Sequence, residues 1–288
     1  MPQHDPPFHN VAIVGFGLIG GSIALALRER WPSVRVTAVD RPNVLAHAAG
    51  SGAIDRAAHS VADLGEPDLL VLAAPVGQNV RLLQDAAERL TSEAVITDVG
   101  GTKRDIVAAA RALPALRAAF VGGHPIGGAE RGGFAFARAD LFRGRPWVFT
   151  PDDRVPPQAL DRLFEFAHGL GAKPATMDAG EHDRLMAFLS HVPQLTSSVL
   201  MDVVGRAATQ DGLRLAGRGL MDTTRLASSP ADIWRDVCAS NADVIGVALD
   251  ALIARLTELR AGLERGDVVE TIFEDAARWR AELMKGRE

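Results

Sequence analysis

The stretch of residues 11–40 restricts the fold most, because it places a glycine triplet between a short apolar run and a helical segment. Residues 11–14 are typical of a buried parallel strand, 22–30 of a helix and 34–39 of a second strand. The spacing G-x-G-x-x-G at such a junction predicts a turn that binds the pyrophosphate of a dinucleotide. The residues expected to bind the cofactor there are Gly15, Gly17, Leu18, Ile19 and Gly20.

Each glycine has its own physical reason in this interpretation. Gly15 allows the tight turn out of the strand, Gly17 lets the backbone approach a phosphate, and Gly20 lets the helix pack against the strand. The helix N-terminus adds unpaired N–H groups and a partial positive charge. A glycine-rich turn in an unrelated α/β protein is the alternative, but it does not explain the acid that follows.

That acid is Asp40, which ends the second strand. A carboxylate at this position can accept hydrogen bonds from both ribose hydroxyls and would repel a 2′-phosphate. The sequence therefore favours NAD over NADP as the cofactor. Arg41 complicates the choice, because an adjacent guanidinium could tolerate the phosphate.

Composition narrows the class of protein. The chain has 288 residues, 47% of them apolar, which is enough for two domains with cores. A formal net charge of −5 without a long basic run argues against nucleic acid or an anionic membrane as a partner. No apolar run approaches the length of a membrane span, and the first ten residues do not resemble a signal peptide. The single cysteine, Cys238, fits a reducing cytoplasm.

Strand and helix signals alternate up to about residue 178 and then stop alternating. This predicts an N-terminal dinucleotide-binding Rossmann domain, residues 1–178, with a doubly wound and mostly parallel sheet. Only helices are expected in residues 179–288, which form a separate helical domain, and the cleft between the domains is the expected substrate site. Further strands are predicted at 68–73, 94–97, 120–121, 147–150 and 173–177. Helices are predicted at 44–50, 79–90, 102–113, 157–170, 181–200, 231–265 and 268–284, with a connector at 52–57.

An apolar stripe marks the long helix predicted at 231–265. Its members alternate steps of four and three residues, as in a heptad pattern. One interpretation buries this stripe within a single subunit, and the other packs it on a second subunit; the sequence does not choose between them. The stripe consists of Ile245, Leu249, Leu252, Leu256, Leu259 and Leu263.

Three loops leave the carboxyl ends of predicted strands, where open α/β sheets bind ligands. The first contains Ala74 and Pro75, which we expect beside the cofactor, and the second spans residues 97–103. The third, residues 122–128, supplies His124 between glycines and a proline. A histidine held rigidly at a strand end suits a general base that takes a proton from a substrate hydroxyl. The alternative is a histidine that only caps a turn.

The helical half offers further candidates. His182 and His191 are nine residues apart, so on an ideal helix they face opposite sides and share a pocket only if the helix starts late or bends. His191 is the preferred site residue, whereas a structural role for His182 is equally compatible with the sequence. Arg218 and Arg225 could each hold a carboxylate by paired hydrogen bonds, although surface ion pairs are the commoner role of arginine.

Several segments together resemble the prephenate/arogenate dehydrogenase family of tyrosine biosynthesis. They span residues 11–241 in the order expected for that family. The segments are VGFGLIGGS, LAAPV, TDVGGTK, GGHPIGGAERGG, LFRGRPWVFTP, EHDRLMAFLSHVPQ and DTTRLASSPADIWRDVCASN.

The resemblance implies a helical domain for substrate binding and dimerisation, residues 179–288, and a homodimer formed through it. It also implies an NAD-dependent oxidative decarboxylation of prephenate to 4-hydroxyphenylpyruvate and CO2. By motif match, His124 resembles the catalytic histidine and Arg225 the arginine that holds a substrate carboxylate, while His182 and His191 match histidines near the active site. The family commonly has a serine where this chain has Gly101. Thr102 or a water would then hold the substrate hydroxyl, or the substrate differs.

Other functions remain to be weighed. Arogenate or an amino-substituted prephenate could replace prephenate as the substrate. The β-hydroxyacid dehydrogenases share the two-domain plan, but they rely on a lysine in the helical domain, where this chain has only the terminal Lys285. A catalytically inactive dinucleotide-binding protein is a third possibility, which Gly101 supports and His124 opposes. The absence of tyrosine excludes the Tyr-Lys pair of short-chain dehydrogenases, and no metal-ligand spacing is present.

Overall fold

The computed structural model describes residues 5–91, 93–114, 116–128 and 131–285. By the density of internal contacts the chain divides into two compact units, Met1–Asn241 and Ala242–Glu288. The first unit holds the whole sheet together with the helices up to Ser240. The domain boundary predicted after residue 178 lies where the last strand ends and only helices follow. That this boundary divides two domains stays a prediction.

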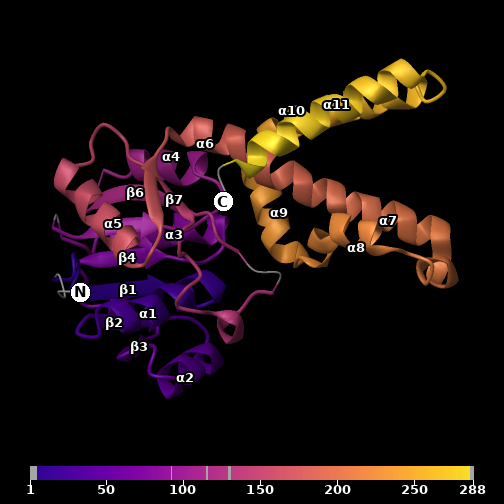
Figure 1. Ribbon diagram of the computed structural model, residues 1–288. Coiled ribbons are helices and arrows are strands. Elements are labelled where there is room, and N and C mark those ends of the chain that lie inside the picture. Colours follow the sequence, from indigo (N-terminus) through magenta and orange to yellow (C-terminus); the bar gives the residue numbers. More distant parts are fainter. Residues whose placement is uncertain (1–4, 92, 115, 129–130, 286–288) are drawn as a thin grey trace. The chain divides into compact units, whose positions relative to one another are not determined.

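One eight-stranded sheet organises the first unit, with the strand order β3-β2-β1-β4-β5-β6-β7-β8 (Figure 1). All neighbouring strands are parallel except β6 and β7, which are antiparallel. This confirms the predicted doubly wound, mostly parallel sheet. The strands are β1 Asn10–Val14, β2 Arg35–Val39, β3 Arg56–Ala58, β4 Leu69–Leu72, β5 Val95–Asp98, β6 Ala119–Pro125, β7 Pro146–Thr150 and β8 Lys173–Thr176.

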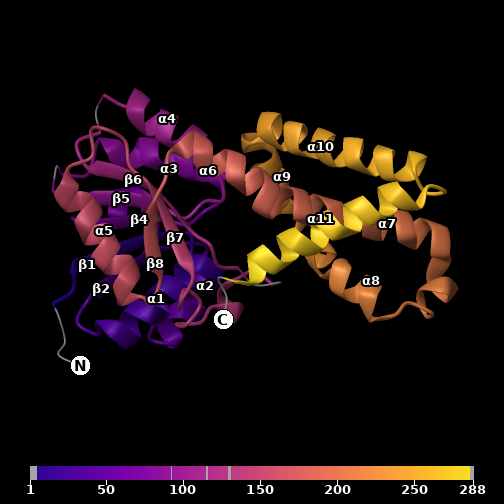
Figure 2. The same cartoon turned by 45° about the horizontal axis from the view of Figure 1, so that its top comes forward.

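The sheet is buried on both faces, because successive residues of its central strands enter different cores. Val11 and Ile13 belong to one core, whereas Ala12 and Val14 belong to the other. The first core also contains side chains of α1 (Leu18–Arg30), α2 (Pro42–Gly50) and α5 (Pro157–Gly169). The second contains those of α3 (Val76–Ala87) and α4 (Arg104–Ala112) (Figure 2).

Two strands differ from the prediction. The segment expected as a connector contains β3, three residues that pair only at the sheet edge. β6 is much longer than predicted, because its second half leaves β5 and pairs with β7 instead. His124 therefore lies within an extended, paired strand and not in a loop beyond the strand end, which fixes its backbone more firmly than expected. Of the loop that follows, Ala129 and Glu130 lie outside the described residues.

The helix predicted at 181–200 is divided by a wide turn. α6 (Ala179–Met186) begins at Asp178, whose side chain accepts hydrogen bonds from the N–H groups of Gly180 and Glu181. A π-helical turn, η3 (Ala187–His191), follows, and α7 (Val192–Leu213) continues with Pro193 in its first turn. A π turn holds an extra residue, so His182 and His191 no longer face opposite sides as they would on an ideal helix.

The prediction of one long helix at 231–265 is wrong, because the helix is interrupted at Asn241. α9 (Ala231–Ser240) ends there, and α10 (Ala242–Ala261) follows. The glycine-containing passage before α9 holds a short helix, α8 (Arg218–Thr223), and a 3-10 turn, η4 (Arg225–Ser228). Two other single 3-10 turns are η1 (Val61–Asp63) and η2 (Phe134–Phe136).

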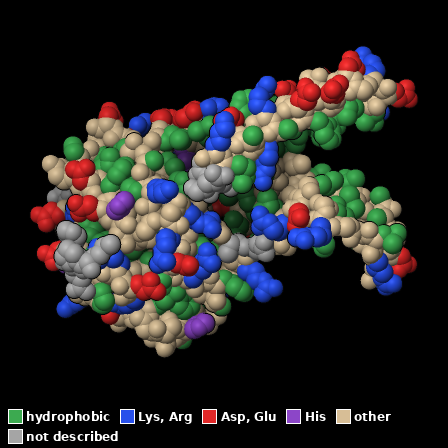
Figure 3. Space-filling model, viewed as in Figure 1, with side chains coloured by type: hydrophobic (Ala, Val, Ile, Leu, Met, Phe, Trp, Pro, Cys, Tyr) green, Lys and Arg blue, Asp and Glu red, His purple; other side chains and the backbone are tan. Residues whose placement is uncertain are grey.

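The second unit consists of α10 and α11 (Gly266–Met284), which contact each other. Much of its apolar surface is exposed, and Figure 3 shows hydrophobic side chains on the surface of these two helices. The exposed side chains include Leu256 and Leu263 of the predicted stripe and Phe273 and Trp279 of α11. Among the described residues no single helix is long and apolar enough to cross a membrane. One bent pair, α9 with α10, meets that test of length and composition.

Candidate active site

The glycine turn has the geometry that a phosphate site requires. Gly15 has a φ of +94°, a conformation that other residues rarely adopt. A Cβ on Gly20 would lie 2.1 Å from the carbonyl oxygen of Gly15, so that position also excludes any side chain. Gly17, in contrast, has open space on its Cβ side, with no described atom within 4 Å. Of the three glycines in the turn, Gly17 is thus the one that leaves a surface on which another molecule can approach the backbone.

The start of α1 is open to such a molecule from the side of Gly17. No side chain among the described residues caps this helix end, and its first N–H groups point to the turn. Phe134 of η2 packs beside it, with its ring 5.2 Å from that of Phe16. Gly21 permits this contact, because a Cβ there would lie 2.5 Å from the Phe134 ring.

Asp40 holds the turn from the end of β2. Its carboxylate accepts hydrogen bonds from the backbone N–H of Phe16, at 2.5 Å, and of Arg41, at 2.6 Å. The Arg41 side chain is exposed and lies 3.6 Å from the same carboxylate. The acid therefore stands beside the phosphate turn, where an adenine ribose would meet it.

The β4–α3 loop is fixed by a buried asparagine. Asn79 accepts a hydrogen bond from the N–H of Ala74 and donates one to the carbonyl of Leu72, both at 3.1 Å. The start of α3 is held from α9, since the N–H of Gly77 donates to the Asp236 carboxylate at 3.0 Å. Ala74 and Pro75 are thereby fixed at the same edge of the sheet as the glycine turn.

A fully buried ion pair lies at the end of β5. The Lys103 ammonium contacts the Asp98 carboxylate, which also accepts the N–H groups of Gly100 at 2.8 Å and Gly123 at 3.1 Å. Burial lowers the pKa of Lys103, and Asp98 opposes that effect. Because Gly123 precedes His124, this ion pair fixes the strand that carries the histidine.

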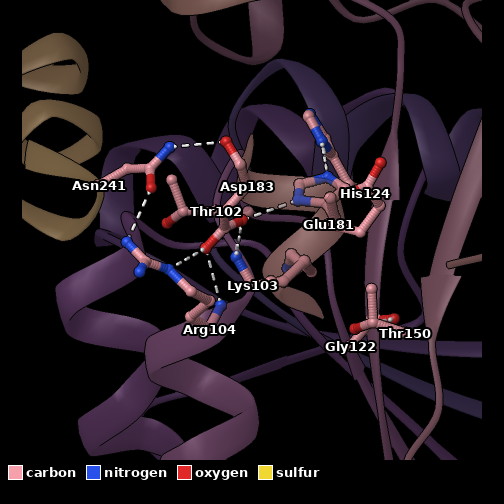
Figure 4. A network of polar contacts seen from close by, with 12 residues as sticks. Thr102, Lys103, Arg104, Gly122, His124, Thr150, Glu181, Asp183 and Asn241 are labelled. Atoms are coloured by element: carbon pink, nitrogen blue, oxygen red, sulfur yellow. Dashed lines mark hydrogen bonds and ion pairs between the residues drawn. The ribbon is translucent and has the colours of Figure 1, made fainter. Parts of the chain in front are cut away.

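Asp183 of α6 is the centre of a second group of contacts (Figure 4). Its carboxylate accepts the backbone N–H of Lys103 at 2.7 Å and that of Arg104 at 2.9 Å, at the start of α4. It also accepts a hydrogen bond from Nδ1 of His182 at 2.8 Å. Burial raises the pKa of Asp183, but these hydrogen bonds outweigh burial and hold the pKa below its ordinary value, so the carboxylate is ionised.

His124 and His182 are in direct contact. Nδ1 of His124 lies 2.9 Å from Nε2 of His182, and the two rings meet edge to face. His182 is completely buried, whereas His124 is partly exposed. Burial is the main cause that holds the pKa of His124 well below its usual 6.5, and the nearby Lys103 ammonium adds to it. His124 is therefore neutral at physiological pH, as a general base must be.

Asn241 brings His191 to the same network. Its amide donates to the backbone carbonyl of Asp183 at 2.9 Å and lies 3.4 Å from Nδ1 of His191. Its oxygen accepts a hydrogen bond from Arg104 at 2.9 Å (Figure 4). His191 is buried and its ring meets that of Trp234 edge to face. The break between α9 and α10 therefore lies at the residue whose amide joins Arg104, Asp183 and His191.

The hydroxyl of Thr102 contacts another side chain of the protein. Thr102 is buried, and its hydroxyl lies 2.8 Å from the hydroxyl of Ser240. Gly101 is partly exposed, and a Cβ there would meet only Val237, at an ordinary contact distance of 3.7 Å. The position of the missing serine is therefore open, and the neighbouring threonine does not fill it.

The two candidate arginines lie on short elements that pack on α7. Arg218 begins α8 and Arg225 begins η4, and both are exposed. Gln194 holds η4 by donating to the carbonyl of Leu226 at 2.7 Å, and Ser197 donates to the carbonyl of Thr223. The structure therefore brings His124, His182 and His191 into one network, and it places Arg218 and Arg225 at the exposed starts of α8 and η4.

Sequence reasoning missed the residues that join these histidines. They are distant in sequence and connect through backbone groups, which no local spacing reveals. The sequence did hold one signal, because charged and polar residues occur inside the segments that carry the family resemblance. Such residues are rarely buried without a partner. The missed residues are Asp98, Lys103, Arg104, Asp183 and Asn241.

A Rossmann sheet, an open glycine turn and a neutral histidine at the same sheet edge define a nucleotide-dependent dehydrogenase. The chain matches the nucleotide-binding domain of prephenate dehydrogenase over residues 23–176, and the dimerization domain of prephenate dehydrogenase over residues 178–275. It belongs to the prephenate dehydrogenase family. Among the described residues no three His, Cys, Asp or Glu side chains are grouped to hold a metal ion.

Individual relatives cover nearly the whole chain. A prephenate dehydrogenase of Bacillus subtilis is 34% identical over 91% of this chain and 72% of its own length. A cyclohexadienyl dehydrogenase of Zymomonas mobilis is 29% identical, covering 96% of both. The crystal structure of prephenate dehydrogenase from A. aeolicus, in complex with hydroxyphenyl propionate and NAD+, superposes with a TM-score of 0.84 at 28% identity, covering 96% of this chain and 98% of that one.

The buried His191 makes a prediction about stability and pH. Burial lowers its pKa from 6.5 to about 4, with Asp183 opposing and His182 adding to the shift. The unfolded chain binds this proton more readily than the folded protein does. Above pH 6.5 neither state is protonated at His191, so the free energy of unfolding is not reduced there. As the pH falls from 6.5 towards 4, protonation of the unfolded chain lowers the free energy of unfolding. We expect His191→Gln to narrow the difference in unfolding free energy between these two pH values, measured by urea denaturation.

The control is His168→Gln on the exposed surface of α5, which should keep the wild-type difference. An equal difference in the wild type and in His191→Gln would contradict the prediction.

Proposed function

We propose that this protein is an NAD-dependent prephenate dehydrogenase that converts prephenate to 4-hydroxyphenylpyruvate and CO2. The observation that carries the proposal is the neutral His124, fixed at the sheet edge beside the nucleotide turn, in a chain of the prephenate dehydrogenase family. Family membership and the lack of a buried lysine in the helical half disfavour a β-hydroxyacid dehydrogenase. The intact histidine network disfavours an inactive nucleotide-binding protein.

The residues present fit NAD. The uncapped start of α1 and the open side of Gly17 suit a pyrophosphate, and Asp40 suits an unphosphorylated ribose. Leu18 and Ile19 begin α1 at that turn, while Ala74 and Pro75 border it from β4. The exposed Arg41 leaves some tolerance for NADP. The bound cofactor would supply the hydride acceptor.

His124 performs the proton chemistry in this proposal. Its free nitrogen accepts the proton of the ring hydroxyl as that carbon is oxidised. The ring carboxylate then leaves as CO2, and its bonding electrons enter the ring and generate a phenolate oxygen. His124 returns the proton to that oxygen, so the base is restored at the end of the turnover. Aromatisation supplies the driving force, and the protein mainly aligns the reactants.

Substrate carboxylates need cationic or hydrogen-bonding partners. Arg225 is our candidate for one carboxylate, with Arg218 and His191 as further contacts. Thr102 is an indirect contributor, since its hydroxyl contacts Ser240 and not open space. Gly101 borders the place where the substrate hydroxyl would lie, which leaves that hydroxyl to His124 and a water.

Each alternative substrate differs from prephenate in one functional group. Arogenate carries an ammonium group where the prephenate side chain carries a ketone, whereas an amino-substituted prephenate keeps the ketone and carries its amino group on the ring. The similarity to a cyclohexadienyl dehydrogenase favours testing these alternatives directly.

The assembly proposed is a homodimer through the helical part. The match to a dimerization domain supports it, as do the exposed apolar side chains of α11, such as Phe273 and Trp279. The single cysteine is compatible with a reducing cytoplasm, which is the proposed location.

The first test compares wild-type protein with His124→Asn. The wild type should turn over prephenate with NAD, faster than arogenate, amino-substituted prephenate or reactions with NADP. Loss of a general base should lower kcat by about 100- to 10,000-fold and leave NAD affinity unchanged. Steady-state kinetics and fluorescence titration of NAD measure the two quantities. Equal losses of turnover and NAD affinity would remove His124 from its catalytic role.

The second test concerns the phosphate turn. In Gly17→Ala the added methyl meets no described atom within 4 Å, so the variant should melt at the wild-type temperature. The methyl would occupy the surface that a pyrophosphate approaches, and NAD affinity should fall by at least about tenfold, or ~1.4 kcal/mol. Gly20→Ala is the contrasting variant, because its methyl clashes with the backbone and should lower the melting temperature. Unchanged NAD binding in Gly17→Ala would contradict the assignment.

The third test restores the missing serine. Gly101→Ser adds a side chain that has room beside Val237 and a hydroxyl that can hold the substrate hydroxyl. One further hydrogen bond should raise kcat/KM for prephenate by about 2- to 10-fold, or ~0.5–1.5 kcal/mol. Gly101→Ala adds the same Cβ without the hydroxyl and should give no gain. A fall in kcat/KM for the serine variant alone would show that the chain uses a different arrangement at this position.

A further inference from the structure

We propose that Asp183, acting through His182, decides which ring nitrogen of His124 carries the hydrogen, and so leaves Nε2 of His124 as the proton acceptor. His182 is then a positioning residue that acts through His124 and does not touch the substrate. The proposal deepens the proposed function, because it explains how the base of that reaction is prepared.

The argument begins at the carboxylate. Nδ1 of His182 lies 2.8 Å from Oδ1 of Asp183. An ionised carboxylate can only accept hydrogen bonds, so Nδ1 of His182 must carry a hydrogen. In a neutral imidazole the other nitrogen is then an acceptor, and Nε2 of His182 is left with a lone pair.

The same logic passes to the next ring. Nε2 of His182 lies 2.9 Å from Nδ1 of His124. Since Nε2 of His182 is the acceptor, Nδ1 of His124 must be the donor and carry the hydrogen. Nε2 of His124 then has the free lone pair. Without the carboxylate, either tautomer of each ring would satisfy the contact between the two histidines.

The surroundings prevent this arrangement from reversing. His182 and Asp183 are both completely buried. The carboxylate is fixed by the N–H of Lys103 on one oxygen and the N–H of Arg104 on the other. It therefore cannot turn away from His182. A fixed acceptor in a site of low dielectric constant holds a tautomer more strongly than the same contact in water.

The chain of contacts also distributes charge during turnover. When Nε2 of His124 accepts the hydroxyl proton, the hydrogen on its Nδ1 can move to Nε2 of His182. The positive charge then lies beside the Asp183 carboxylate, 2.8 Å away. The reverse movement returns a proton from Nε2 of His124 to the phenolate oxygen. One proton enters and one leaves, with no other reactant required.

The direct test is 15N NMR of full-length protein labelled at histidine, without substrate or cofactor. The signal of His124 is identified by its loss in His124→Asn. We expect Nδ1 of His124 to resonate as a protonated nitrogen and Nε2 as an unprotonated one. The opposite pattern, or a mixture of the two, would overturn the proposal.

A kinetic test uses His182→Asn, whose shorter amide can still reach Asp183 but not His124. We expect kcat to fall by about 10- to 100-fold, with KM for prephenate and the affinity for NAD unchanged. The control is His59→Gln on an exposed loop, which should behave as wild type. An unchanged kcat, or a raised KM with unchanged kcat, would overturn the positioning role.

The two tests separate this inference from the proposed function. The NMR pattern requires no reaction, so it would stand if no prephenate turnover were found. Conversely, a protein that oxidises prephenate but shows hydrogen on Nε2 of its resting His124 would retain the proposed function and lose this inference. His182→Asn that fails to fold leaves the wild-type spectrum as the deciding measurement.

Discussion

The arrangement of the site depends on one buried carboxylate, that of Asp183. It accepts the backbone N–H groups that begin α4, which follows β5, and the ring of His182 on its own helix. A buried charge of this kind is costly unless several donors surround it, and two of the donors here, the adjacent N–H groups of Lys103 and Arg104, are 80 and 79 residues away in sequence. The first helix after the sheet is thereby fixed to the strand ends where the ligand site lies.

A second buried charge fixes the other side of the same site. Asp98 accepts the N–H of Gly123 and pairs with Lys103, so β5 and β6 are held together where β6 turns from a parallel to an antiparallel partner. A glycine is required at 123, because a Cβ there would lie 2.6 Å from the carbonyl of Asp98. His124 is partly exposed and firmly held, as the sequence indicated, but strand pairing and this ion pair hold it and not a loop.

The sequence predicted those features whose cause is local. The glycine turn, Asp40 and the central strands follow from residue spacing and apolar runs, and the structure confirms the sheet that they imply. The π turn of η3 and the break at Asn241 could not be predicted, because both give up regular helical geometry for distant contacts. Asn241 bridges Arg104, Asp183 and His191, which lie on three different elements. The pairing of His124 with His182 was missed for the same reason, since 58 residues separate them.

The low pKa of His124 raises a question about its role as a base. Burial and the nearby charge of Lys103 lower its pKa, so in the resting enzyme Nε2 of His124 is unprotonated but only weakly basic. A ring hydroxyl is a far weaker acid still, and proton transfer before oxidation would be unfavourable. As hydride leaves the same carbon, however, the hydroxyl becomes a protonated carbonyl, which even a weak base deprotonates. A weak base is therefore better suited here than a strong one, because it is unprotonated at physiological pH and releases its proton readily to the phenolate.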